Sequence, residues 1–108
     1  MMELSQREQS VIQSAIKYAE AERMEDLQKA LETYDSEDEI KRLFGKNTFG
    51  CHEAVDRSFM VAENWEHYVQ NHPAILMDPE IYRMSKIVSS MMYEVYNSIS
   101  TKDIDMPD

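Results

Sequence analysis

Two glycines and three prolines are the residues in this chain of 108 that most readily interrupt regular backbone, and their scarcity constrains the fold most. A protein built from many short strands needs many turns, and turns depend heavily on these two residue types. Much of the remaining sequence consists of Glu, Lys, Gln, Ala and Met, which are good helix formers. The sequence therefore predicts an all-α fold.

Apolar spacing predicts a first helical region over residues 5–34. Ser5 and Glu8 form an S-x-x-E capping box, in which each side chain bonds the free backbone amide of the other residue. Apolar residues then recur at spacings of three and four as far as Tyr34. This region contains no Gly or Pro that would mark a break near residues 22–24. The sequence is therefore compatible with one long helix or with two, and we expect four or five helices in the chain.

A second capping box, SEDE at residues 36–39, predicts a short helix that ends at Gly45. The stretch GKNTFG that follows, residues 45–50, is typical of a loop. A third helix is predicted from about Cys51 to Asn71, because Pro73 disfavours helical backbone in the residue before it.

The last helix is predicted to have Asp78 as its N-cap and Pro79 at its first position, and to run to about Ser100. Its side chains form the most regular apolar stripe of the sequence: Ile81, Met84, Val88, Met91, Met92, Val95 and Ile99. The short link before Asp78 predicts that the third and last helices form an antiparallel hairpin. We expect the N-terminal helices to cover the apolar face of this hairpin. The expected architecture is a small helical bundle forming a single domain over residues 1–100, followed by a frayed acidic tail at 101–108.

The charge balance narrows the classes of partner. The formal charge is −10, from 21 acidic residues against 11 Lys and Arg. Direct nucleic-acid binding needs clustered cations, so we do not expect it. The longest apolar runs have four residues, far too few for a membrane span. A single cysteine and an N-terminus without an apolar signal segment predict a cytoplasmic protein.

The stretch CHEAVDR, residues 51–57, contains the pattern H-E-x-x-D. In the H-E-x-x-H motif of zinc proteases, two histidines hold a metal while the glutamate activates its bound water. Asp56 could replace the second histidine, which makes His52 and Asp56 weak candidates for metal ligands. A metal, however, needs three or four protein ligands, and the other two histidines lie toward the far end of the same helix.

A simpler interpretation of CHEAVDR is the first turns of a helix. His52 with Asp56, and Glu53 with Arg57, are pairs at the (i, i+4) spacing that stabilises a helix surface. Cys51 falls on the predicted core face, where a cysteine usually acts as a small apolar group.

The sequence offers no better catalytic or cofactor site. Glu63, Glu66 and His67 approach the ligand pattern of di-iron bundles, but no second copy occurs on another helix. No glycine-rich phosphate-binding motif is present. We therefore predict no catalytic residue and no cofactor, and we expect the protein not to be an enzyme.

One flank of the last helix is a candidate protein interface, because Tyr and Met are enriched in such surfaces. The predicted interface residues are Tyr82, Ser89, Met92, Tyr93 and Tyr96. The alternative is that this flank packs beneath the N-terminal helices of the same chain.

These observations favour a small protein that acts through protein–protein contact, as a homodimer formed through the tyrosine flank. Two alternatives stay open. Residues 20–39 hold nine acids against Arg23 and Lys29, a net charge of −7, which would suit an acidic antagonist or immunity-type protein that blocks a basic partner. The other alternative is a metal-binding helical protein that uses His52 and Asp56.

Overall fold

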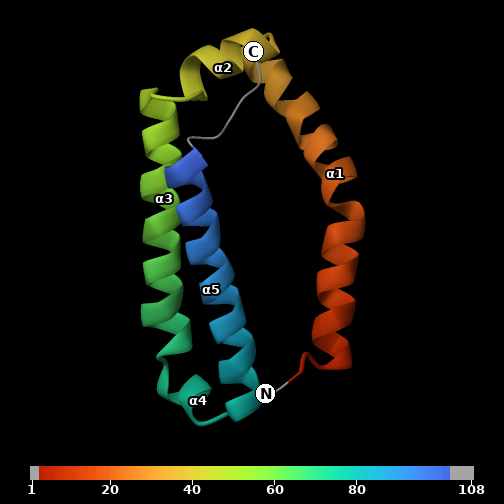
Figure 1. Cartoon of the computed structure of the whole chain (residues 1–108), viewed down its shortest axis with the longest axis vertical. Coiled ribbons are helices and arrows are strands. Elements are labelled where there is room, and N and C mark those ends of the chain that lie inside the picture. Colours follow the sequence, from red (N-terminus) through yellow and green to blue (C-terminus); the bar gives the residue numbers. More distant parts are fainter. Residues whose placement is uncertain (1–2, 103–108) are drawn as a thin grey trace. The chain divides into compact units, whose positions relative to one another are not determined.

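The computed structural model describes residues 3–102 (Figure 1). This part of the chain contains helices and no strands, which confirms the predicted all-α fold and is consistent with a small helical bundle. The elements are α1 (Gln6–Tyr34), α2 (Glu37–Phe44), α3 (Phe49–Trp65), the single π-helical turn η1 (Glu66–Gln70), α4 (Pro73–Leu76) and α5 (Pro79–Lys102). No helix among the described residues is both long enough and apolar enough to cross a membrane.

Helix α1 is one uninterrupted helix of 29 residues, which settles the choice between one helix and two. Both hydrogen bonds of its capping box are present. The amide of Glu8 donates to Ser5 Oγ at 3.1 Å, and the amide of Ser5 donates to Glu8 Oε1 at 2.7 Å. A cap of the predicted kind also starts α5, where Asp78 Oδ1 accepts hydrogen bonds from two backbone amides, each at 3.1 Å.

Helix α3 begins two residues before the predicted start, because Thr48 acts as its N-cap and accepts a hydrogen bond from the amide of Cys51 at 3.1 Å. Gly50 lies in the first turn, where the chain passes very close to the end of α2. A Cβ atom at Gly50 would overlap the Leu43 carbonyl oxygen and the Phe44 ring. Only glycine therefore allows α2 and α3 to meet at this distance.

The predicted third helix is helical nearly to its expected end, but it is not a regular α-helix throughout. Its last turn is the π-helix η1, and the backbone leaves the helix after Gln70. Part of the predicted connection is the one-turn helix α4, which His72 caps by accepting a hydrogen bond from the amide of Ala74. Helix α5 continues to Lys102, so the first two residues of the predicted tail are helical, and residues 103–108 lie outside the described part.

The chain divides into two compact units, one up to Glu39 and one from Ile40 onward. The first unit consists mainly of α1. The second contains the packed helices α3 and α5, with η1 and α4 between them (Figure 1).

Helices α3 and α5 lie side by side and run in opposite directions (Figure 1). Trp65, at the end of α3, donates a hydrogen bond from Nε1 to the carbonyl oxygen of Ser85 at 3.0 Å. Phe59, earlier on α3, contacts the rings of Tyr93 and Tyr96, which are later on α5. A step backward along α3 thus corresponds to a step forward along α5.

Candidate functional site

The side of α5 that packs against α3 is lined by small residues. Ser85 and Ser89 are buried there, with Ser89 only 1 % exposed, and Ala62 of α3 is completely buried. The hydroxyl of Ser89 donates to the carbonyl oxygen of Lys86 at 3.1 Å, so its polar group is satisfied within its own helix. Small side chains permit a short distance between helix axes, and this explains why two serines occupy the centre of the contact.

The stripe that we predicted as the apolar side of α5 lies elsewhere on the helix surface, and much of it faces solvent. Ile81 is 42 % exposed, Val88 38 %, Met91 59 % and Val95 50 %. At ~100° per residue these side chains lie about 90° around the helix from Ser85 and Ser89. This stripe is therefore not the side of α5 that packs against α3.

The open stripe of α5 continues onto α3 through a shallow apolar groove of about 320 Å³. The groove is lined by Arg57, Ser58 and Val61 from α3 and by Met92 and Val95 from α5. Val61 is 50 % exposed. We call this surface the open apolar face; it consists of Val61, Ile81, Val88, Met91, Met92 and Val95.

The five predicted interface residues lie largely on the side of α5 that faces α3. Ser89 is buried, and Tyr82, Met92, Tyr93 and Tyr96 are half-buried. Phe59 of α3 covers part of two of these rings, with centroid distances of 6.3 Å to Tyr93 and 5.2 Å to Tyr96. The use of this flank as an interface stays a prediction, but much of its surface is already in contact within the chain.

A polar hollow of about 390 Å³ lies beside Tyr93. It is lined by Glu63, Asn64, Glu66, His67, Asn71 and Tyr93, which includes the carboxylate–histidine group noted in the sequence. The Tyr93 hydroxyl donates a hydrogen bond to Glu66 Oε2 at 3.2 Å. Desolvation raises the pKa of Tyr93 above its ordinary value, and the negative charge of Glu66 raises it further. The hydrogen bond shows that one of these carboxylates already serves to hold α5 against the end of α3.

The weak metal candidates, His52 and Asp56, are both exposed on the surface of α3. No group of three or more His, Cys, Asp or Glu side chains in residues 3–102 is arranged to hold a metal ion. The predicted pair of Glu53 and Arg57 forms, at 3.4 Å. Cys51 is buried, in agreement with its predicted place on the core face of α3.

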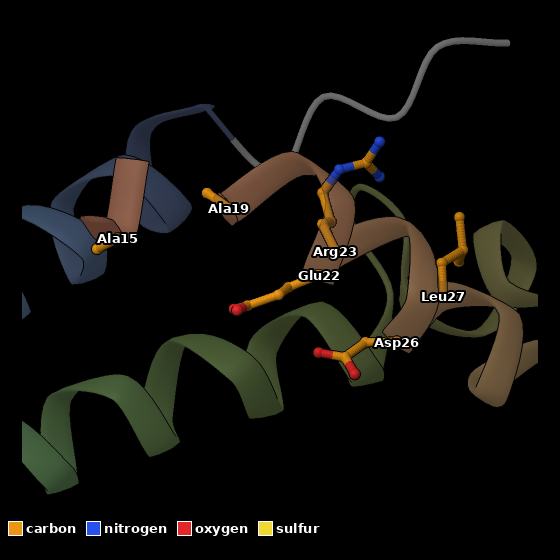
Figure 2. A pocket seen from close by; sticks show the side chains of 6 residues that line it. All are labelled: Ala15, Ala19, Glu22, Arg23, Asp26 and Leu27. Atoms are coloured by element: carbon orange, nitrogen blue, oxygen red, sulfur yellow. The ribbon is translucent and has the colours of Figure 1, made fainter. Parts of the chain in front are cut away.

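The acidic segment is exposed along α1 and the start of α2. Two of its acids form ion pairs within α1, Glu20 with Arg23 and Glu25 with Lys29. Figure 2 shows the side chains of Glu22 and Asp26 on one side of α1, while Arg23 points to the other side. The carboxylates of this segment are therefore accessible to a partner, although nothing in their arrangement selects one.

No protein-family model, no curated protein and no solved structure matches the chain. The functional argument therefore rests on the residues and their geometry, and within the unit from Ile40 onward the open apolar face is an apolar surface that α3 does not cover.

Proposed function

We propose that this protein acts by protein–protein contact rather than by catalysis, as a homodimer formed through the open apolar face. The observation that carries the proposal is a row of apolar side chains along α5 that α3 leaves exposed, formed by Ile81, Val88, Met91 and Val95. Single exposed apolar residues are common, but a continuous apolar row is typical of a contact surface. The prediction of a homodimer is thereby kept, with its contact surface moved from the tyrosine flank to the neighbouring side of α5.

The size of the face suits a weak pairing with a second copy of the chain. On α5 the face runs from Ile81 to Val95, which corresponds to about 21 Å at ~1.5 Å per residue. Two packed helices present a width of about 20 Å, because helix axes lie ~8–10 Å apart. The product is about 420 Å² per copy, roughly half of the ~800 Å² per partner of a standard stable interface.

Charge also favours self-association on this side of the molecule over capture of a charged partner. The six residues of the open apolar face carry no charge, whereas the acidic residues concentrate on residues 20–39. A basic partner would gain little from an uncharged stripe, because its attraction to this protein depends on carboxylates.

Analytical ultracentrifugation over a concentration series tests the proposal directly. We expect a monomer–dimer equilibrium with a dissociation constant in the micromolar range or tighter. A protein that sediments as a monomer at several hundred micromolar would overturn the proposed homodimer.

The acidic segment supports a second candidate function, the blocking of a basic partner, because its carboxylates are exposed. Salt separates the two functions. Two copies that each carry a charge of −10 repel, so added salt should strengthen the dimer, whereas it should weaken binding of a basic protein. Binding to a basic model protein that is unchanged between low and high salt would count against the second candidate.

A further inference from the structure

We propose that the connection between α1 and α2 is a joint with two states. In this structure the joint is bent at Asp35, the C-cap of α1. In the second state the backbone of Asp35 and Ser36 is helical, and residues 6–44 form one continuous helix. Straightening the joint would turn the direction in which α1 leaves α2. The inference does not depend on the proposed homodimer, because it concerns only the local backbone of residues 31–39.

The backbone at Asp35 forms a classic γ-turn. Its φ is 69° and its ψ is −43°, and the amide of Ser36 donates a hydrogen bond to the carbonyl oxygen of Tyr34 at 2.8 Å. This turn is rare, and it is strained for a residue that has a side chain. Strained backbone of this kind costs free energy and is found preferentially at functional sites and switch regions. The bent state therefore has a cost that a helical Asp35 would not have.

The sequence permits the straight state. Residues 6–44 contain neither glycine nor proline. The amide of Asp35 already donates to the carbonyl oxygen of Leu31 at 3.1 Å, as it would in an uninterrupted α-helix. The helical hydrogen bonding of α1 thus extends up to the γ-turn, and new dihedral angles at Asp35 and Ser36 are sufficient for it to continue into α2.

The straight state would also satisfy backbone amides at the start of α2. Glu37 and Asp38 are the first two residues of α2, so their amides have no acceptor within that helix. In a continuous helix they would donate to the carbonyl oxygens of Thr33 and Tyr34. These hydrogen bonds and the release of strain both favour straightening.

Two local interactions oppose straightening and hold the bend. Ser36 Oγ accepts a hydrogen bond from the amide of Glu39 at 3.2 Å, which caps α2. Glu37, Asp38 and Glu39 occupy the first turn of α2, where negative charge is favourable. In a continuous helix Asp35 would instead lie beside Asp38 and Glu39, at the (i, i+3) and (i, i+4) spacings where like charges repel. Strain and free amides are thus balanced against a cap and charge, which makes the joint sensitive to residue 35.

Distances between two spin labels measure the state of the joint. The labels are attached to Ala21→Cys in α1 and Glu37→Cys in α2, both exposed positions, in a Cys51→Ala background. In a continuous helix the two Cα atoms would lie ~24 Å apart at ~1.5 Å per residue. A bend at Asp35 shortens this distance, so pulsed electron paramagnetic resonance separates the two states.

Substitutions at residue 35 should move the balance in opposite directions. Asp35→Gly relieves the strain of the γ-turn, because glycine adopts positive φ freely, and should leave the shorter distance alone. Asp35→Ala keeps the strain, removes the repelling charge and favours helix, so the population near ~24 Å should rise at least threefold. Asp26→Ala is the matched control, because it removes the same charge from an exposed position within α1 and should not change the distances. Equal distance distributions in the two Asp35 variants would overturn the proposal.

Amide hydrogen exchange provides a second measurement that needs no label. The amides of Glu37 and Asp38 exchange freely in the bent state and are protected in the straight one. We expect both amides to exchange at least threefold more slowly in Asp35→Ala than in Asp35→Gly. The amide of Leu27, inside α1, should exchange at the same rate in both variants. Equal rates at Glu37 and Asp38 in the two variants would contradict a joint that straightens.

Discussion

Two neighbouring sides of α5 carry side chains of different size, which permit different distances between α5 and another helix. Toward α3 the helix presents Ser85 and Ser89, which are buried, and tyrosines whose rings extend along the contact. About 90° around the same helix it presents Ile, Met and Val side chains that remain exposed. The more polar side is thus the one that α3 covers.

This difference teaches that the most apolar stripe of a helix need not be the one that packs against its neighbour in a hairpin. Close packing of two helices requires small side chains at the centre of their contact, and serine satisfies that requirement once its hydroxyl bonds to its own helix. Larger apolar side chains suit a contact with wider spacing, such as the seam between two chains.

The largest effect should come from a charge on the open side. Val88→Glu places a carboxylate in the open apolar face, and we expect the proposed dimer to weaken at least 100-fold, or about 2.7 kcal/mol. Analytical ultracentrifugation measures the change. Asn97→Glu is the matched control, because it adds the same charge on the opposite, exposed side of α5 and should alter the dissociation constant less than about threefold. Equal effects of the two variants would remove the open side as the interface.

A large side chain on the covered side should act on folding instead. Ser89→Leu must force α3 and α5 apart, so we expect a loss of about 1–3 kcal/mol in the free energy of unfolding. Urea denaturation followed by circular dichroism measures it. Ser90→Leu, at the neighbouring exposed position, should change the stability by less than about 0.5 kcal/mol. If Ser89→Leu were as well tolerated, the close contact through the serines would be wrong.

A smaller effect, of opposite sign, is expected at Ser85. Its hydroxyl is buried and has no hydrogen-bond partner within the described residues 3–102, whereas the hydroxyl of Ser89 has one. Ser85→Ala should therefore stabilise the protein by about 0.5–1 kcal/mol, while Ser89→Ala should be neutral or slightly destabilising. Thermal unfolding of the two variants side by side checks the difference, and a destabilised Ser85→Ala would contradict it.

The smallest effect is the titration of Tyr93. Because its pKa is raised in the folded protein, its contribution to stability is complete below the ordinary tyrosine pKa of about 10 and is lost as the pH rises through the higher folded value. The ultraviolet difference spectrum between the unaltered protein and Tyr93→Phe isolates this phenol. Glu66→Gln removes a negative charge beside it, so the midpoint should move down toward 10.

Glu80→Gln is the control for this titration, because it removes a carboxylate at the other end of α5. It should leave the Tyr93 midpoint in place. A midpoint that is the same in all three proteins would show that Glu66 does not act on Tyr93 as the 3.2 Å hydrogen bond indicates.

Much of the fold could be predicted because its signals are local. The caps at Ser5 and Asp78 formed as predicted, and Cys51 is buried on the predicted core face of α3. The π-turn at Glu66–Gln70 was missed, because no residue type marks a single extra residue within a helical turn.

The candidate surface was harder to predict than the helices. The sequence shows both the apolar stripe and the tyrosine flank of α5, but it does not show which of the two packs against α3. The available signal was the pair of serines at 85 and 89, one helical turn apart and aligned with Ala62 in the contact. Two small residues one turn apart are typical of the centre of a close helix contact, so this pair indicates the side of α5 that packs against α3.

The sequence by itself thus determined the all-α class and the approximate bounds of the longer helices, because capping, helix propensity and the scarcity of Gly and Pro act within a few residues. Only the tertiary structure decided which side of α5 faces α3. That choice depends on how closely two backbones can approach, which is a property of residues 20 or more positions apart, such as Trp65 and Ser85. The spacing of apolar residues predicts that one side of a helix is buried, but it does not predict what buries that side.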